Sequence, residues 1–330
     1  MISGTAPVSL GDLQAGVEQR LEGVRGEIRR LIEADFPLIA LVNSHLTQMQ
    51  GKIFRPTLLL LSEAATSPEP QARAVSLAAV VELIHLATLV HDDAVDHSVL
   101  RRGMPTINAL FSHQVAVIMG DYLYSRAVIE LVRLADLEAL GVLSRVTNEM
   151  TVGEMRQLLA HDPLAFSEAD YDLLIRAKTA SLISGACEVG ALDGSPEERE
   201  AMRRFGEGLG MAFQIVDDLL DFTGDEADTG KPAGLDLREH KVTLPLIHAL
   251  PQMSSAERAQ VEELMDAPEP AERQISAVVQ AVAGRGGLVY ARERAQKHCA
   301  QAEAALEALP TTPARDALRA SLTYVLERRR

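Results

Sequence analysis

Two short acidic clusters dominate the chemistry that this sequence offers. In the first, Asp92 and Asp96 lie four positions apart within an Asp-Asp-Ala-Val-Asp segment, so on a helix both carboxylates project from one face, one turn apart. Two like charges at that spacing destabilise a helix, whereas a bound cation turns the repulsion into attraction. Magnesium takes oxygen ligands of this kind. One cluster alone is equally typical of a solvated acidic helix end.

A second acidic cluster favours the metal site. Asp217, Asp218 and Asp221 repeat the spacing of the first cluster in another predicted helix, after a Phe-Gln-Ile-Val segment. The leucines and the valine around them are typical of buried positions, so we expect these carboxylates to enter a cavity. Magnesium held by a few carboxylates usually keeps several waters and takes its other ligands from the phosphates of a substrate. The two clusters therefore predict several divalent ions between facing helices, together with a phosphorylated substrate.

A site for phosphate also needs cationic side chains, and most of the five lysines of this chain lie in a few short segments. Four of them lie in short distinctive segments, and the fifth, Lys297, is interpreted as a surface cation. Arg101 and Arg102 follow Asp96 closely enough to share its site. Lysine is a compact charge suited to phosphate, whereas arginine offers a bidentate fork. The four lysines of the predicted site are Lys52, Lys178, Lys231 and Lys241.

The stretches that must position these residues have the composition of long helices. Four long stretches contain no proline and are rich in Ala, Leu, Glu and Arg, which favour helix. Apolar residues recur at helical spacing before the first cluster, as at Leu77, Val80 and Ile84. We expect an all-α chain with one domain over residues 1–330, a motif-bearing core over about 45–250 and shorter helices over about 251–330. The proline-free stretches are residues 71–104, 106–162, 164–195 and 197–231.

Composition limits the class of protein. The 330 residues are 47% apolar and 24% charged, and a chain of this length can bury a core without disulfides or a structural metal. The net charge of −15 repels phosphate backbones, so nucleic acid is not an expected partner. The segment Met1–Gly11 lacks the pattern of a signal peptide, and the apolar segment from about Val75 to Val90 is expected to be too short to span a bilayer. These features predict a cytoplasmic protein.

In their order and spacing, these segments resemble the motifs of the trans-polyprenyl diphosphate synthases. The resemblance runs from about Gly51 to Leu250, which is most of the chain. The segments 84–93 and 120–124 are most similar to long-chain members such as octaprenyl and solanesyl diphosphate synthases. The matching motifs are Gly51-Lys52-x-x-Arg55-Pro56, the aspartate-rich segment leading into Arg101-Arg102-Gly103, Lys178-Thr179, Phe213-Gln214 with Asp217-Asp218-x-x-Asp221, and Gly230-Lys231.

The resemblance implies a single large helical bundle of the isoprenoid synthase type, with a central apolar cavity, in a homodimer. It places an allylic diphosphate between the two acidic clusters under three magnesium ions, for which manganese can substitute. The implied catalytic residues are Asp92, Asp93, Asp96, Lys178, Thr179, Gln214 and Asp217. The implied metal ligands are Asp92, Asp96, Asp217 and Asp221, with Asp93 and Asp218 contributing directly or through water.

The resemblance also separates two diphosphate positions. Departure of diphosphate from the allylic substrate leaves a carbocation, which requires a closed, largely apolar cavity and which the oxygens of Thr179 and Gln214 can steady. The double bond of isopentenyl diphosphate then attacks, and the released diphosphate is a plausible base for the proton. Residues matching the allylic position are Arg101, Lys178, Thr179, Gln214 and Lys231. Those matching the isopentenyl position are Lys52, Arg55, His85 and Arg102.

The residues one helical turn before the first cluster predict a long product. In the family, a bulky aromatic residue near this point stops elongation, whereas Ala87 and Thr88 are small. We expect an open tunnel and an all-trans polyprenyl diphosphate of about C35 to C50, made for a quinone side chain. Side chains of the following helix, about Thr106–Ala135, are an alternative set of residues that can block the tunnel at a deeper point. The alternative is a short-chain farnesyl or geranylgeranyl diphosphate synthase.

Two functions of other classes compete with this hypothesis. A class I terpene cyclase shares the helical fold but usually replaces the second acidic cluster and needs no second diphosphate site. A non-catalytic subunit of a heteromeric synthase would lack some aspartates of the acidic clusters or some of the lysines. Both clusters and all these lysines are present in this sequence. Transient contact with a membrane surface during product release is compatible with an amphiphilic product.

Three further features are unusual. His240 stands where the family usually carries glycine, and Leu235 stands where a polar residue is common. A histidine at a loop position that needs a positive φ predicts strain or a shifted loop next to Lys241. The three arginines at residues 328–330 are interpreted as a solvated chain end rather than as groups that meet a diphosphate.

Overall fold

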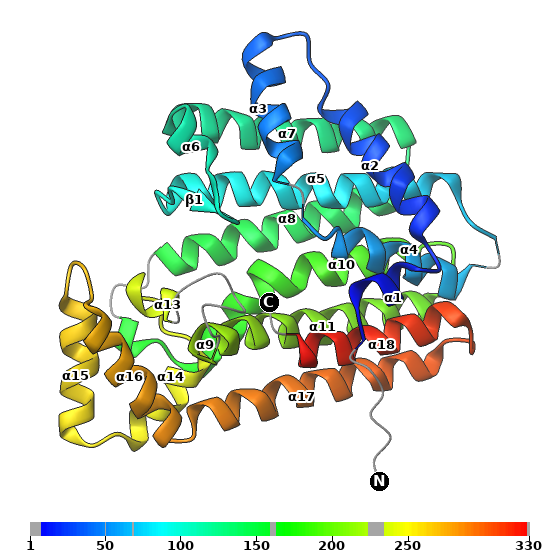
Figure 1. Ribbon diagram of the computed structural model, residues 1–330. Helices are drawn as coiled ribbons and strands as arrows, with labels where there is room; N and C mark the ends of the chain where they lie inside the picture. The colour runs from blue at the N-terminus through cyan, green and yellow to red at the C-terminus, as the bar shows by residue number, and fades with distance from the viewer. Residues whose placement is uncertain (1–7, 50, 68, 159–162, 224–233, 329–330) are drawn as a thin grey trace.

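The computed structural model describes residues 8–49, 51–67, 69–158, 163–223 and 234–328, and it confirms the all-α prediction (Figure 1). All strand structure within these ranges lies in one hairpin of β1 (Leu100–Arg101) and β2 (Met104–Pro105). The long helices are α2 (Glu18–Ile32), α3 (Pro37–Gln48), α4 (Phe54–Thr66), α5 (Ala72–Val95), α7 (His113–Leu134), α8 (Leu137–Leu158), α10 (Ser181–Gly190), α11 (Pro196–Thr223), α15 (Ser255–Asp266), α16 (Glu272–Gly284), α17 (Gly287–Ala305) and α18 (Pro313–Glu327).

Short elements connect these helices. Residues Arg176–Ala180 form a π-helical turn that joins α9 directly to α10, and such turns occur frequently at functional sites. The short helices are α1 (Leu10–Gln14), α6 (Ile107–Leu110), α9 (Glu168–Ile175), α13 (Leu235–Arg238) and α14 (Leu244–Ala249), with 3-10 turns at Pro163–Ala165, Leu250–Gln252 and Leu306–Ala308.

Helix α5 is the centre of the bundle. It lies beside α7 and α8 in Figure 1 and packs against α2, α4 and α7. Its 24 residues make it longer than the predicted apolar segment, and by length and composition it could cross a membrane, so the expectation that it is too short is wrong. However, 61% of its most apolar window is buried inside the protein. An apolar surface all round a helix is also what a core position requires.

The hairpin after α5 returns two arginines toward the first acidic cluster. Arg102 and Gly103 occupy its turn with φ of 52° and 75°, as a two-residue hairpin turn with positive φ at both central positions requires. The strands pair Arg101 with Met104. This tight turn explains how residues that follow Asp96 by only a few positions can fold back beside the end of α5.

Helices α10 and α11 approach each other closely because α11 carries glycines one turn apart. A Cβ atom on Gly206 would lie 2.7 Å from the Cα of Ser184, and one on Gly210 would lie 2.5 Å from the Cα of Ala180. Both distances are too short for a side chain. The two glycines therefore set the separation between the helix that follows Lys178 and Thr179 and the helix that carries Gln214 and the second acidic cluster.

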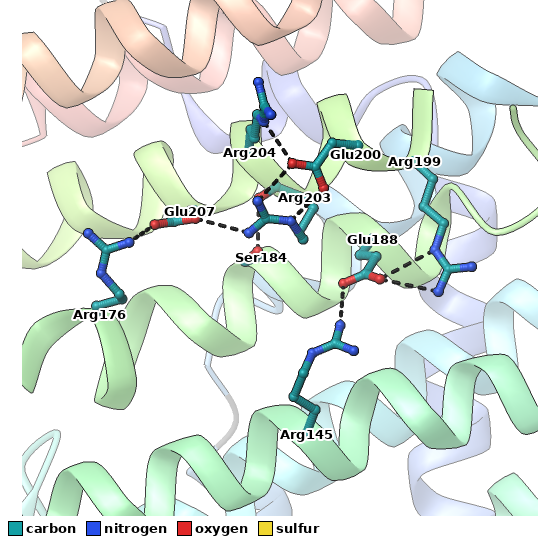
Figure 2. A network of polar contacts seen from close by, with 9 residues as sticks. All are labelled: Arg145, Arg176, Ser184, Glu188, Arg199, Glu200, Arg203, Arg204 and Glu207. Carbon is teal, nitrogen blue, oxygen red and sulfur yellow. Dashed lines mark hydrogen bonds and ion pairs between the residues drawn. The ribbon is translucent and has the colours of Figure 1, made fainter. Parts of the chain in front are cut away.

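Ion pairs add to the packing of α10 between α8 and α11 (Figure 2). The side chain of Glu188 on α10 is 9% exposed and contacts Arg145 of α8 at 2.8 Å and Arg199 of α11 at 3.2 Å. A nearby hydrogen bond runs from the Ser184 hydroxyl to the carbonyl of Arg203 over 2.8 Å. Because Glu188 is nearly buried, both arginines are needed to offset its desolvation.

The carboxy-terminal helices extend the bundle and add a second, smaller core. Helix α17 packs along α11, and α18 packs against α4 and α11. Helices α14, α15 and α16 enclose their own apolar cluster, which includes Leu246, Val261 and Val278 (Figure 1). The division of the chain into one domain stays a prediction.

We expect Gly206→Ala to lower the free energy of unfolding by about 1–3 kcal/mol, because the new methyl group must push α10 away from α11. The matched control is Gly141→Ala on α8, where a Cβ would meet nothing within 4 Å. That exchange should instead stabilise the protein by about 0.5–1 kcal/mol through its gain in helix propensity. Thermal or urea unfolding followed by circular dichroism compares the two. Equal effects would contradict close packing at Gly206.

Candidate active site

A cavity of about 880 Å³ lies between α4, α5, α8 and α11, beside the hairpin and the π-helical turn. It brings together most of the predicted site residues, which come from segments far apart in the sequence. Those that line it are Arg55, His85, Ala87, Thr88, Asp92, Asp96, Arg101, Arg102, Lys178, Thr179, Gln214 and Asp217. Lys52, Asp93 and Asp221 are not among the lining residues, and Lys231 lies outside the described residues.

The first acidic cluster ends α5 at the cavity. The Asp92 carboxylate lies 3.7 Å from the Lys178 ammonium group, which itself contacts Glu154 at 2.7 Å. Burial raises the pKa of Asp92 from 3.8 to about 6, and nearby Glu154 and Asp96 add to the effect. Asp93 turns the other way, is buried, and forms an ion pair with Arg101 at 2.8 Å. Asp92 and Asp96 are therefore the members of this cluster that face the cavity.

The second acidic cluster lies near the end of α11. Asp217 lines the cavity, whereas Asp218 is buried behind it. The carboxylate of Asp221 accepts hydrogen bonds from the backbone N–H groups of Leu235 and Asp236, at 3.0 and 3.1 Å. Asp221 thereby holds the start of α13 against α11. Its part in metal binding stays a prediction.

The interpretation of the carboxy terminus as a solvated end is wrong for Arg328. The Arg328 side chain is only 9% exposed and forms an ion pair with Asp217. Its guanidinium carbon lies 4.0 Å from the centre of the Phe213 ring, and burial lowers the pKa of Arg328 to about 10. Helix α18 causes this placement, because it packs on α4 and α11 and ends beside Phe213. Residues 329 and 330 lie outside the described part of the chain.

A group of cationic side chains occupies a different part of the cavity wall. The Nε atom of Arg55 is buried and has no hydrogen-bond partner among the described residues. Arg102 donates to the Met49 carbonyl over 2.9 Å, and it passes so close to Gly51 that a Cβ there would lie 2.7 Å from its Nη1. Burial, and then the charges of Arg55, Arg102 and Arg101, hold the pKa of His85 well below its ordinary value. This arrangement attracts an anion.

Lys52 and Lys241 differ in their relation to the cavity, because only Lys241 is among its lining residues. Lys52 has an exposed side chain, and its backbone carbonyl accepts a hydrogen bond from Gln14 over 3.1 Å. Lys241 lines the cavity and contacts Glu239 at 2.7 Å. The preceding residue, His240, has a φ of 57°, which confirms the positive φ expected for this loop. Its ring is within 2.8 Å of the Ala267 carbonyl, and this contact holds the unusual residue in place.

Four buried or half-buried polar residues of the site were missed by sequence reasoning. Glu82 is buried one turn before His85, and burial raises its pKa although Arg55 and Arg102 oppose the shift. Burial and the charges of Asp218 and Asp221 raise the pKa of Asp236 to about 8. A glutamate inside an apolar helix was a signal for Glu82, whereas nothing in the sequence singled out the others. The other two are Glu154 and Tyr171.

Tyr171 ends a hydrogen-bond chain that starts at the cavity wall. The Thr179 hydroxyl donates to the Gln214 carbonyl oxygen over 2.8 Å, and the Gln214 amide nitrogen donates to Asp218 over 2.8 Å. The Tyr171 hydroxyl donates to the other oxygen of Asp218 over 2.5 Å. The π-helical turn and the close approach of α10 to α11 bring Thr179 and Gln214 into contact.

The residues predicted to control product length form part of the wall. Ala87 is 3% exposed and Thr88 bonds its hydroxyl to the His85 carbonyl over 2.8 Å, so neither projects far into the cavity. Tyr124 of α7 also lines the cavity, and its hydroxyl lies 3.3 Å from that of Thr147 on α8. Tyr124 is therefore the aromatic residue of α7 that can block chain growth at a deeper point of the cavity.

The oxygen-rich wall fits divalent cations that also bind a phosphorylated substrate. Asp92, Asp96 and Asp217 offer hard oxygen donors of the type that magnesium takes. Burial raises the pKa of Asp92, and a cation bound beside it would lower that pKa again by favouring the ionised carboxylate. Within the described residues, no three His, Cys, Asp or Glu side chains converge on one point.

Comparison with known proteins gives a consistent family. The family model described as polyprenyl synthetase matches residues 37–282. Octaprenyl diphosphate synthase of Escherichia coli (strain K12) is 37% identical over 302 residues, covering 91% of this chain and 93% of the relative. All-trans-nonaprenyl-diphosphate synthase (geranyl-diphosphate specific) of Rhodobacter capsulatus is 39% identical over 308 residues, covering 93% and 94%.

Solved structures agree with the sequence comparison. The polyprenyl synthase from Caulobacter crescentus CB15, complexed with calcium and isoprenyl diphosphate, superposes with a TM-score of 0.92 and 33% identity, covering 99% of this chain and all of that one. A decaprenyl diphosphate synthase from Rhodobacter capsulatus superposes with a TM-score of 0.91 and 35% identity, covering 98% and 100%.

We expect Asp92→Asn to stabilise the metal-free protein at pH 8 by about 1–2 kcal/mol, because the folded state no longer confines a buried charge. The pKa of Asp92 is raised from 3.8 to about 6 on folding, so ionisation of this carboxyl costs the wild type stability above pH 6. The advantage of the variant should therefore shrink as the pH falls from 6 to about 4. Unfolding of both proteins in chelator across this range checks the sign. A variant that is less stable at pH 8 would contradict it.

Proposed function

Because this chain belongs to the polyprenyl synthetase family and is a prenyltransferase, we propose that it condenses isopentenyl diphosphate head to tail onto an allylic diphosphate to make a long-chain all-trans polyprenyl diphosphate. One observation carries the proposal. The same cavity is lined by the carboxylates of Asp92, Asp96 and Asp217, here called the acidic wall, and by the guanidinium groups of Arg55 and Arg102, here called the cationic wall. Two differently charged walls suit two diphosphates, one bound through cations and one bound by arginine directly.

The allylic diphosphate is assigned to the acidic wall. Asp92, Asp96 and Asp217 would hold magnesium, or manganese in its place, and Asp221 is the fourth ligand of the proposal. Three ions per site would neutralise the negative charge that develops on the departing diphosphate. Lys178, at 3.7 Å from Asp92, is placed to contact the same phosphates, together with Arg101. Lys231 completes this set in the proposal.

Isopentenyl diphosphate is assigned to the cationic wall. The buried, unpartnered Nε of Arg55 and the guanidinium of Arg102 supply directed hydrogen bonds to phosphate oxygens. Burial and then the field of both arginines lower the pKa of His85 in the free protein. A bound diphosphate would reverse that field and favour the charged imidazole. Lys52 is the fourth residue of this set.

The reaction moves electrons from one substrate to the other. The bond between the allylic carbon and the diphosphate oxygen breaks, and its electron pair stays on the diphosphate. The π electrons of isopentenyl diphosphate form the new carbon–carbon bond, and a proton leaves the adjacent carbon for the released diphosphate. The part of the protein is to hold both substrates in line, exclude water and offer the neutral oxygens of Thr179 and Gln214 to the cation.

The length of the product is assigned to the long-chain class. Ala87 and Thr88 leave the wall below the first cluster open, and relatives named as octaprenyl, nonaprenyl and heptaprenyl diphosphate synthases support a product of about C35 to C50. A quinone side chain is the proposed use of such a product. One relative named as a short chain isoprenyl diphosphate synthase keeps the short-chain alternative open.

We also propose a cytoplasmic homodimer that contacts a membrane surface only transiently. The outer face of α7 supports an interface between two copies, because Ile118, Ile129 and Val132 are more than half exposed there. Apolar side chains that are gathered on one helix face in this way favour association.

Incubation of the purified protein with magnesium, isopentenyl diphosphate and farnesyl diphosphate tests the function. We expect elongation to products between heptaprenyl and decaprenyl diphosphate, resolved by chain length, and no elongation in chelator. A stop at farnesyl or geranylgeranyl diphosphate would retain the chemistry and overturn the long-chain assignment. Release of a cyclic hydrocarbon, or no reaction with any primer, would favour the terpene cyclase or the non-catalytic subunit.

We expect Ala87→Phe to shorten the product to the farnesyl or geranylgeranyl class, because an aromatic ring at this buried position would fill the cavity next to the first cluster. The rate of the first condensation should change little, since the diphosphate contacts remain. Ala87→Ser is the matched control and should keep the wild-type product length. Chromatography of radiolabelled products measures both. Long products from the phenylalanine variant would show that the chain grows along another wall.

A further inference from the structure

Tyr171 lies outside every motif of the sequence, yet it is connected to the cavity through two other side chains. It is 2% exposed, comes from α9, and donates its hydroxyl hydrogen to Asp218 of α11 over 2.5 Å. Asp218 is 5% exposed and accepts its second hydrogen bond from Gln214 over 2.8 Å. Gln214 in turn accepts from Thr179 over 2.8 Å, and these last two side chains line the cavity.

The chain of hydrogen bonds has a direction, and Asp218 sets it. An ionised carboxylate only accepts hydrogen bonds, so Gln214 must present its amide nitrogen to Asp218. The carbonyl oxygen of Gln214 then faces Thr179 and accepts its hydroxyl hydrogen. With that hydrogen committed, the lone pairs of the Thr179 oxygen are left for the cavity. The hydrogens that form these three bonds are thus directed toward Gln214 and Asp218 and not into the cavity.

Resting on the function proposed above, we propose that Tyr171 is a positioning residue that acts through Asp218 to hold Gln214 and Thr179 with their oxygen lone pairs toward the allylic cation. A primary amide can turn over with little steric change, because its oxygen and nitrogen ends have nearly the same shape. Only the partners on each side decide its orientation. Tyr171 fixes one oxygen of Asp218 and so leaves the other in line with the Gln214 nitrogen.

The orientation of Gln214 and Thr179 affects mainly the stability of the transition state, in which the positive charge develops. Groups oriented in advance stabilise charge where it develops and need no reorganisation during the reaction. If the Gln214 amide turned over, its positive end would face Thr179, and the threonine hydroxyl would be free to point its hydrogen at the cation. The ground-state diphosphates would sense this change less than the cation does, since in the proposed function they are held mainly by magnesium at Asp92 and Asp217 and by the cationic side chains of the site.

Tyr171→Phe tests the proposal, because it removes the hydroxyl group and keeps the ring. We expect kcat to fall about tenfold to a hundredfold, within the range seen when one oriented dipole is lost. The KM values for isopentenyl and farnesyl diphosphate and the magnesium requirement should stay within about twofold of wild type, because uniform binding is unaffected.

Two inhibitors separate positioning from a general structural effect. An ammonium analogue of the allylic cation, bound together with inorganic diphosphate, should lose affinity by about the same factor as kcat. A thiolo analogue of farnesyl diphosphate, which keeps the diphosphate but carries no positive charge on its prenyl chain, should bind as it does to the wild type. Equal losses for both inhibitors, or increases in both KM values, would mean that Tyr171 only supports the fold and would overturn the proposal.

Tyr290→Phe is the matched control. The Tyr290 hydroxyl of α17 donates to Glu168 at the start of α9 over 2.7 Å, so it also connects α9 to a neighbouring helix through a carboxylate. Within the described residues, its hydroxyl group bonds to Glu168 and takes no part in the hydrogen bonds that join Thr179, Gln214 and Asp218. Its kcat and inhibitor affinities should remain within about twofold of wild type. A loss equal to that of Tyr171→Phe would overturn the proposal.

Asp218→Asn provides a second variant, which also serves if Tyr171→Phe does not fold. The asparagine amide can donate as well as accept, so it permits the turned-over orientation of Gln214. We expect kcat and the affinity for the ammonium analogue to fall at least as much as in Tyr171→Phe. Wild-type values would overturn the proposal. Failure of the wild-type protein itself to elongate farnesyl diphosphate would refute the proposed function instead.

Discussion

The close approach of α10 and α11 is the constraint on which the site depends most. Gly206 and Gly210 allow the backbone of α10 and of the π-helical turn before it to lie where a side chain would otherwise be. Only at this separation can Thr179, in the π-helical turn that leads into α10, reach Gln214 on α11. The ion pairs of Glu188 on the same helix hold α10 between its two neighbours. Packing at Gly206 and Gly210 therefore determines polar geometry one to two helical turns away.

The site concentrates charge at a cost that its ligands can relieve. Burial raises the pKa of Asp92 to about 6 and that of Asp236 to about 8, and it lowers the pKa of Arg55 and His85. Each shift records a charged form that the free protein stabilises poorly. Cations would favour the ionised acids, and a diphosphate would favour the charged bases. The free site is thus less stable because its charges lack partners, and the same charges give it affinity for metal and diphosphate.

The sequence predicted the part of the site that local spacing encodes. Asp92 with Asp96, and the hairpin arginines, follow from helix periodicity and from a short turn, and the positive φ of His240 follows from its place in a loop motif. Arg328 and Tyr171 could not be found in this way, because their roles depend on where α18 and α9 pack. Glu82 was visible as a charge in an apolar helix, but its partners come from tertiary structure. Local pattern predicts elements, and only packing decides which side chains meet.

A cation has to be stabilised without being captured, and the arrangement of acids around Gln214 addresses this problem. A carboxylate oxygen with no partner would form a bond to an allylic carbocation. On this side of the cavity, Asp218 is engaged by Tyr171 and Gln214, and Asp221 by backbone N–H groups. Asp217 is paired with Arg328 in the free protein and would be engaged by magnesium in the proposed reaction. The oxygens left for the cation, on Thr179 and Gln214, are neutral and weakly nucleophilic. Engagement of the acids therefore protects the intermediate as well as organising the wall.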